Sequence, residues 1–269
     1  MSTQPGAGTE PSEITLSDRD IAAAQELLGQ ASAELPLPVL TDEEIVALDG
    51  LDHPQAVALP WLSAHEDQRE LACNVALRTL LSKGFVVPVA DVPSQAPNRI
   101  GADLELTGVM TLRRSGQKVV VAELNKAGDE KTWLYGYLHG DVALLELVDP
   151  EGSHAFSFCP VSELAQSILE LAGTTGIQGT DAEAENLDEA GFTARASAEL
   201  SDVRGVTTVV VIDSASDDTG NVTIYTAPER LYALSASEED GQARFQLGQV
   251  SAETLATRLT GLITAHGEA

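Results

Sequence analysis

The pattern of apolar and polar positions divides the chain into an N-terminal helical part and two later stretches of short strands. Apolar residues recur at helical spacing in residues 17–28, 42–49 and 63–83, and Ser17, Thr41 and Ser63 are suited to cap these helices at their starts. A glycine follows each segment, as expected where helices end. Residues 85–88 then predict a short strand, and 93–101 a loop.

Strand-like runs dominate from residue 104 onward. They cover 106–113, 118–124, 133–138, 142–148 and 155–159 in the first stretch, and 206–212, 222–225, 231–235 and 243–247 in the second. Residues typical of turns separate consecutive runs, so we expect antiparallel hairpins. Each stretch leads into a helix, opened by Ser162 over 163–171 and by Ser251 over 251–265. The acidic segment 181–190 is also expected to be helical.

An internal repeat relates the two stretches. When the chain is shifted 89 positions along itself, residues 116–162 align with 205–251 without a gap, and nine positions are identical. Glycines match in turns, and apolar residues such as Val121 and Val210 match in strands. The sequence therefore predicts an α+β fold, with an antiparallel sheet built from two pseudo-symmetric repeats of a β-meander plus a helix, after N-terminal helices.

Four parts are expected along the chain. Residues 1–40 form a flexible leader with a short helix, 41–172 the first half, 173–180 a linker and 181–269 the second half. The glycines of the linker could suggest a phosphate-binding loop, but no Lys follows them. We interpret this segment as a connector between the halves.

The charge of the chain limits its partners. There are 15 Lys and Arg against 42 Asp and Glu, which gives a formal net charge of −27. This charge repels phosphate backbones and anionic lipids, so we expect neither nucleic acid nor membrane as a partner. Residues 76–87 could form the recognition helix and wing of a DNA-binding regulator, an alternative that the charge disfavours. Because the sequence has no recognisable signal peptide or membrane span, we expect a cytoplasmic location.

No catalytic or metal-binding motif stands out. His139 near Asp141 could act as an acid–base group, but a turn histidine is the simpler interpretation because no GxSxG motif supplies a nucleophile. The other histidines are scattered singly and are interpreted as surface residues: His53, His65, His154 and His266. Cys73 and Cys159 form no CxxC pair, and the acidic loop 213–220 lacks EF-hand spacing. We therefore expect no enzyme, cofactor or metal, with an enzyme of unrecognised site as the alternative.

A small basic cluster interrupts the acidic sequence. Arg113, Arg114 and Lys118 lie close together, on what is expected to be a hairpin. They could bind an acidic partner, but pairing with neighbouring carboxylates is the interpretation we favour.

The order of the segments allows a comparison with a known family. Residues 62–66 (LSAHE) lead to 76–86 (ALRTLLSKGFV), and the duplicated strands end in Val161-Ser162 and Val250-Ser251 before leucine-rich helices. In this order, over about residues 40–265, the chain resembles the EspG family of cytosolic proteins associated with ESX (type VII) secretion in actinobacteria. The resemblance implies binding without catalysis. Members of that family hold the hydrophobic tip of a helical PE–PPE-type secretion substrate and keep it soluble until export.

A chaperone of this kind needs an exposed apolar groove with a polar rim. We expect the terminal helix, 251–265, to form one wall of that groove. Leu255, Leu259 and Leu262 should face the sheet, while Ala256 and Ile263 border the groove and contact the protein partner. The sequence indicates no oligomeric state.

Overall fold

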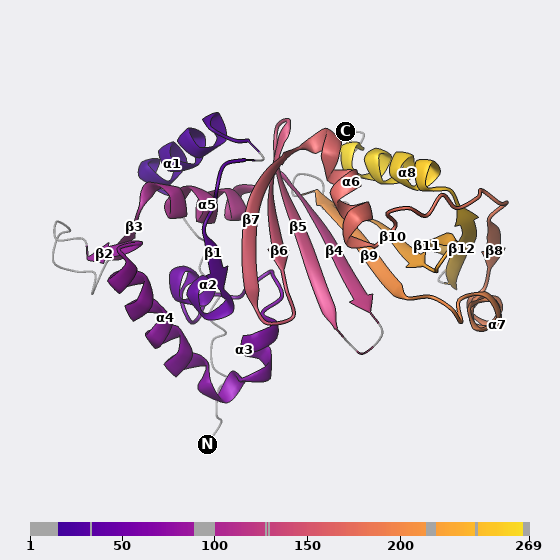
Figure 1. Ribbon diagram of the computed structural model, residues 1–269, viewed down its shortest axis with the longest axis horizontal. Coiled ribbons are helices and arrows are strands. Elements are labelled where there is room, and N and C mark those ends of the chain that lie inside the picture. The colour runs from indigo at the N-terminus through magenta and orange to yellow at the C-terminus, as the bar shows by residue number, and fades with distance from the viewer. Residues whose placement is uncertain are drawn as a thin grey trace, which may run out of the picture.

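The computed structural model describes residues 16–32, 34–88, 100–126, 128, 130–213, 219–239 and 242–265. The helices of this part of the chain are α1 (Asp18–Gly29), α2 (Asp42–Asp49), α3 (Pro60–Ala64), the 3-10 turn η1 (Glu66–Gln68), α4 (Arg69–Lys83), α5 (Leu104–Ser115), α6 (Val161–Leu171), α7 (Glu189–Glu199) and α8 (Ala252–Thr264). Most of the helices before residue 116 gather at one end of the molecule (Figure 1).

The strands form one large antiparallel sheet and one small one. They are β1 (Val39–Thr41), β2 (Val86–Pro88), β3 (Ile100–Ala102), β4 (Lys118–Lys126), β5 (Lys131–His139), β6 (Val142–Val148), β7 (Ser153–Pro160), β8 (Glu185–Leu187), β9 (Gly205–Asp213), β10 (Thr219–Thr226), β11 (Leu231–Glu239) and β12 (Gln242–Val250). The ten-stranded sheet has the order β1-β7-β6-β5-β4-β9-β10-β11-β12-β8, and β2 pairs with β3. The predicted α+β class, with N-terminal helices and an antiparallel sheet, is confirmed.

The two halves of the chain share the large sheet. A meander β4–β7 is followed by α6, and a meander β9–β12 is followed by α8. The first strands of the two meanders, β4 and β9, pair with each other and make the sheet continuous. A four-stranded meander followed by a helix thus occurs in both halves, while the superposition of these two parts as structural repeats stays a prediction.

Helices cover both faces of the sheet. On one face α6 and α8 pack on β4, β5 and β9–β11, around a core that includes Val120, Leu164, Val209 and Leu255. On the other face the N-terminal helices pack on β5–β7, around Tyr135, Tyr137, Phe156 and Phe158. Because Leu134 and Leu138 belong to the first core and Tyr135 and Tyr137 to the second, β5 alternates between the two faces. A smaller apolar cluster lies between α7 and strands β11 and β12.

The predicted N-terminal boundaries are largely confirmed. Ser17 and Thr41 each form a capping box at the start of α1 and α2, and Gly84 ends α4 in the left-handed conformation. The expected start of the long helix at Ser63 is wrong. Pro60 instead opens the short helix α3, and α4 begins only at Arg69, after η1.

Three further expectations about secondary structure are wrong. Residues 106–113 belong to helix α5, whose N-cap Asp103 accepts a hydrogen bond from the backbone N–H of Leu106. Within 181–190 the chain forms strand β8, and α7 begins only after the N-cap Asp188. The helix α6 starts at Val161 with Pro160 at its N-cap, so Ser162 does not cap it. Of the loop expected at 93–101, residues 93–99 lie outside the described residues, and 100–101 belong to β3.

Candidate functional site

The terminal helix α8 does not form the expected groove. Ile263 is only 2% exposed and belongs to the same core as Leu255 and Leu259. Residues four apart share a face of a helix, so these three side chains all point toward the sheet. Ala256 is half-buried against that core. The expectation that Ile263 borders an open groove is therefore wrong.

An open groove lies instead along α4. It has a volume of about 460 Å³ and is lined by Thr41, Glu43, Glu44, Trp61, Gln68, Leu71, Ala72, Val75, Ala76, Thr79 and Lys83. Leu71 is 67% exposed and Val75 is 51% exposed. Two large apolar side chains one helical turn apart thus lie open to solvent in the same groove.

The exposure of Leu71 and Val75 follows from how α4 packs. The helix turns Cys73, Ala76 and Leu80 inward, and these are its buried side chains. The apolar positions of α4 extend around more of its circumference than its neighbours cover. The sequence predicts an apolar stripe along this helix. Among the described residues, no neighbouring segment covers the part of the stripe that carries Leu71 and Val75.

The shape of the groove suits a helix. Its α4 side carries the half-buried Ala72, whose small side chain allows a second backbone to approach closely. Trp61 lines it from α3, and its ring stacks on His65 with centroids 4.3 Å apart. His65, expected as a surface residue, is half-buried and its Nδ1 lies 2.8 Å from the Trp61 carbonyl oxygen. Gly152 supports Trp61 from behind, because a Cβ at this position would lie 2.8 Å from the Trp61 Cβ.

Three charged residues line the groove, Glu43, Glu44 and Lys83. Further charges occur along α4 and just before it. Glu66 and Asp67 lie just before α4 and Glu70 lies in its first turn, whereas Arg78 and Lys83 lie toward its end. Two of the charges have partners: Arg69 lies 3.5 Å from Glu66, and Lys83 lies 3.6 Å from Glu44.

A cluster of buried polar side chains, centred on His154, includes residues on the buried side of α2. This histidine is fully buried, so its interpretation as a surface residue is wrong. Its Nε2 lies 2.8 Å from Asp42 Oδ1, and its Nδ1 lies 2.7 Å from Glu146 Oε1. Asp42 Oδ2 also accepts a hydrogen bond of 2.9 Å from the backbone N–H of Leu62. The cluster therefore links α2 and α3 to strands β6 and β7.

Two arginines extend this cluster to α5. Arg113 donates to Glu146 and to Asp49, each at 2.9 Å, and Arg114 also donates to Asp49. The hydroxyl of Tyr137 donates to Glu146 at 2.5 Å. Arg113 and Arg114 thus pair with neighbouring carboxylates, as favoured from the sequence, although they lie on a helix and not on a hairpin. Lys118 likewise lies 3.6 Å from Asp213.

The charges of the cluster balance when His154 is protonated. Burial alone would lower the pKa of His154, but the hydrogen bonds to Asp42 and Glu146 outweigh burial and raise it. Burial would raise the pKa of Glu146, but Arg113, His154 and Tyr137 hold it below its usual value. The imidazolium and two guanidinium groups then neutralise the carboxylates of Asp42, Asp49 and Glu146.

The His154 cluster is built to connect elements of the fold. Neither His154 nor the carboxylates it contacts, Asp42 and Glu146, has any exposed surface, so a substrate has no access to them. Acid–base catalysis needs a side chain within hydrogen-bond reach of a substrate. We therefore assign these residues to structure. The alternation of β7, which places His154 with Phe156 and Phe158 on one face, is the sequence signal that could have revealed the burial.

The fold also accounts for His139 and the two cysteines, while His266 and residues 214–218 of the acidic loop lie outside the described residues. His139 lies at the end of β5, with its Nε2 3.0 Å from the Leu112 carbonyl oxygen, and burial lowers its pKa. Cys73 and Cys159 are both free and buried. No group of three or more His, Cys, Asp or Glu within the described ranges could hold a metal ion.

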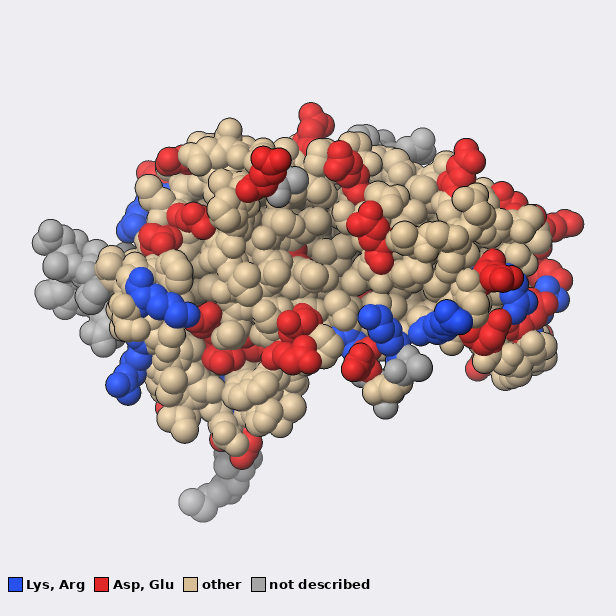
Figure 2. Space-filling view, in the orientation of Figure 1, with Lys and Arg blue, Asp and Glu red and all other residues tan. Residues whose placement is uncertain are grey.

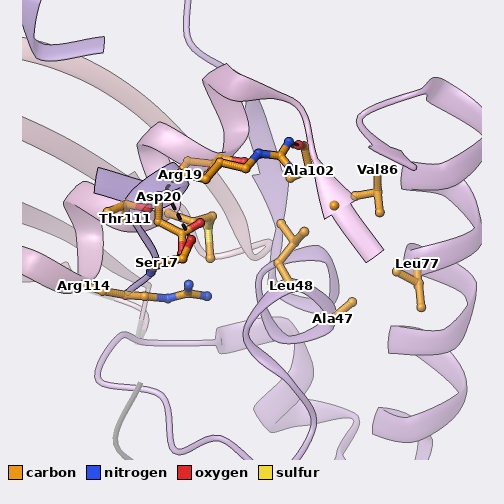
Figure 3. Close-up of a pocket in the computed structure, with 13 residues that line it drawn as sticks. Ser17, Arg19, Asp20, Ala47, Leu48, Leu77, Val86, Ala102, Thr111 and Arg114 are labelled. Carbon is orange, nitrogen blue, oxygen red and sulfur yellow. Dashed lines mark hydrogen bonds between the residues drawn. The ribbon is translucent and has the colours of Figure 1, made fainter. Parts of the chain in front are cut away.

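A smaller pocket of about 360 Å³ lies among α1, α2, α5 and the small sheet (Figure 3). Leu48, Leu77, Val86 and Met110 contribute its apolar lining. The polar groups that line it already bind within the protein: Arg19 donates to the Ala102 carbonyl, Asp20 pairs with Ser17, and Arg114 with Asp49. This pocket therefore offers few polar groups to a ligand.

Comparison with protein-family models and with curated proteins finds no match for the chain. In the part of the chain that the structure describes, no helix combines the length and apolar character needed to cross a membrane. These comparisons point to no functional site. The groove along α4 is therefore a candidate site on the evidence of its geometry alone.

Proposed function

We propose that this chain is a non-enzymatic binding protein that holds an apolar helical segment of a protein partner in the α4 groove. The observation that carries the proposal is the exposure of Leu71 and Val75 within one groove. Apolar side chains spaced a turn apart, beside small residues and within a polar rim, are what a helix laid in a groove contacts.

Energetics support this use of the groove. Covering the exposed parts of Leu71 and Val75 would contribute about 1 kcal/mol for each side chain. Trp61 adds an aromatic surface, a residue type that is enriched where binding energy concentrates. The His154 cluster supports the same interpretation, because Asp42 in this cluster joins α2 to α3, and both helices line the groove.

The kind of partner that we propose follows the resemblance to the EspG family. We propose that the partner is a helical PE–PPE-type secretion substrate, held in the cytoplasm by its hydrophobic tip. An exposed apolar tip promotes aggregation, and covering it in the groove keeps such a substrate soluble.

Co-expression with PE–PPE-type pairs tests the proposal. The expected result is a soluble complex that elutes as one species in size-exclusion chromatography. The variant Leu71→Gln/Val75→Gln keeps helix propensity but removes the apolar contacts, so it should lose the complex. The matched control, Val39→Thr/Ile212→Thr, removes apolar side chains that are 60% and 41% exposed elsewhere, and should keep it.

Two results contradict the proposal. A complex that survives Leu71→Gln/Val75→Gln undiminished would exclude the α4 groove as its site. Failure of every PE–PPE-type pair tested to form a soluble complex would exclude this class of partner.

A further inference from the structure

One of the three charged residues that line the α4 groove has no ion-pair partner in the part of the chain that the structure describes. Glu44 accepts a hydrogen bond from the backbone N–H of Thr41 and pairs with Lys83 across 3.6 Å, and its side chain is only 7% exposed. The third charge, the carboxylate of Glu43, is half-buried in the first turn of α2. Two carboxylates and one ammonium group leave the lining with a net charge of −1, which belongs to Glu43.

A buried thiol on α4 shows how close Glu43 lies to that helix. Burial raises the pKa of Cys73, Arg69 lowers it, and Glu43 raises it further, so both charges act on this thiol. Arg69 pairs with Glu66 across 3.5 Å and lies outside the groove lining. The cation nearest to this part of α4 is therefore occupied elsewhere.

The same thiol places Glu43 beside the exposed apolar pair of α4. Cys73 lies midway between Leu71 and Val75 in the chain, about 3 Å along the helix axis from each. The carboxylate of Glu43 thus lies at the level of these two side chains, in the same groove. A segment that covers Leu71 and Val75 also comes within reach of Glu43.

The charge of the whole chain acts in the same direction. The formal net charge is −27. Acidic side chains are spread across the visible face of the molecule, whereas basic side chains gather at its left end and along its lower edge (Figure 2). A field of this sign attracts cationic segments and repels acidic ones before contact is made.

From the lining of the groove we propose that its occupant is a basic amphipathic helix, whose apolar face covers Leu71 and Val75 and whose Lys or Arg beside that face pairs with Glu43. The inference rests on the proposed function. It adds the charge of the bound segment and assigns Glu43 as the residue that selects it.

Selection follows from what each kind of helix does to Glu43. A neutral apolar helix would take water from this carboxylate and return no hydrogen-bond donor, which is costly for a charged group. An acidic helix would add a like charge beside it. A Lys or Arg replaces the lost water with a charge-assisted hydrogen bond, so the groove discriminates by penalising the other two classes.

Two hydrocarbon-stapled peptides of about 16 residues test the inference. Both carry Leu along one face, and they differ only at one position on each side of that face, which is Lys in one peptide and Gln in the other. Lys on both sides presents a cation to Glu43 whichever way the helix runs. Fluorescence anisotropy should show that the basic peptide binds more tightly. This preference should be about fivefold smaller on Glu43→Gln, the contribution expected of one well-formed ion pair.

The comparison of both peptides on both proteins isolates the pair of charges. It cancels differences in peptide helicity and the general attraction of a cation to an acidic protein. Glu253→Gln is the matched control, because Glu253 is the second residue of α8 as Glu43 is of α2. It removes the same charge at the same helical position and should leave the preference unchanged. Leu71→Gln/Val75→Gln should weaken both peptides, which locates their binding in the groove.

Crosslinking tests the contact in the unaltered protein and does not depend on the folding of any variant. A carbodiimide joins a carboxylate to an amine that touches it. Treatment of the complex should link the Lys of the basic peptide to Glu43, as identified by mass spectrometry. The Gln peptide, which lacks these amines, should give no such link.

Each adverse result overturns a definite statement. Equal affinity of the two peptides, a preference undiminished on Glu43→Gln, crosslinks confined to other carboxylates, or binding of neither peptide would overturn the inference. Self-association that Leu71→Gln/Val75→Gln abolishes would make a second copy of the chain the occupant and would also overturn it.

The inference and the proposed function fail separately. If the basic peptide binds as expected but no PE–PPE-type pair forms a complex, the proposed class of partner fails and the inference stands. If such a complex forms in the groove while the peptides show no preference that depends on Glu43, the function stands and the inference fails.

Discussion

Val121 and Val210 lie directly opposite each other in β4 and β9. A shift of 89 positions equates the same two residues in the sequence. Around them the register is symmetric, because Val119 pairs with Ile212 and Glu123 pairs with Thr208. The pairing of β4 with β9 is therefore the one that a two-fold axis between these valines requires.

If the halves are structural repeats, equivalent core positions should respond alike to truncation. Beyond the ungapped repeat, an insertion of two residues aligns Leu164 of α6 with Leu255 of α8. Both side chains are fully buried in the same core. We expect Leu164→Ala and Leu255→Ala each to lower the free energy of unfolding by about 3 kcal/mol, measured by urea denaturation. A large loss at one position and almost none at the other would argue against equivalence.

The His154 cluster should contribute strongly to stability. Replacing His154 by Gln leaves Asp42 and Glu146 buried without their cation, so we expect the free energy of unfolding to fall by about 3 kcal/mol. His139→Gln is the control and should cost less than about 1 kcal/mol, because His139 is half-buried and makes one hydrogen bond to a backbone carbonyl. Equal losses in the free energy of unfolding for the two substitutions would show that the buried ion pairs of His154 add nothing to stability.

The same cluster predicts how stability depends on pH. The pKa of His154 is raised in the folded protein, so its contribution is fully present below the unfolded value of about 6.5 and is lost as pH rises through the folded pKa. The pKa of Glu146 is lowered, so its contribution is present above about 4.5 and is lost as pH falls through the folded pKa. Denaturation from pH 4 to pH 9 should show a decline above about pH 6.5 that His154→Gln lacks. An identical slope in both proteins would contradict the assignment.

Gly152 should tolerate no side chain. Its φ is +81°, and a Cβ there would lie 2.8 Å from Asp42 and from Trp61. We expect Gly152→Ala to lower the free energy of unfolding by more than about 2 kcal/mol, since it adds a collision to backbone strain. Gly140→Ala is the matched control, because Gly140 also has positive φ, +62°, but has open space around it; it should cost only about 1 kcal/mol. Similar losses of stability in the two variants would show that backbone strain accounts for the effect and that the collision with Asp42 and Trp61 adds nothing.

The parts of the fold that the sequence predicted depend on local chemistry. The capping boxes at Ser17 and Thr41 fix helix starts through residues three apart, and the strands of both meanders follow from their apolar runs and turns. The prediction of a strand at 106–113 is wrong because β-branched residues and Gly108 lower the helical character of helix α5 in the sequence. The structure explains the glycine: a Cβ at residue 108 would lie 3.0 Å from Leu27, so α1 packs closely there.

The candidate site depended on contacts that sequence spacing does not reveal. Ile263 and Leu71 each lie on the apolar stripe of a helix, yet one is buried and the other is 67% exposed. The difference arises from which neighbours cover each helix. His154 and Asp42 are far apart in the chain, and only the pairing of β1 with β7 brings their elements together. Pairing between distant segments is a tertiary property, which periodicity alone does not encode.

Hydrogen exchange of the chain with and without a bound PE–PPE-type pair tests the α4 groove most directly. Amides that a partner covers exchange more slowly, and each segment is followed separately by mass spectrometry. We expect protection to rise in α3 and α4, residues 60–83, and to stay unchanged in α8, residues 252–264. Protection concentrated in α8, or no change in α4 when the complex has formed, would contradict the account.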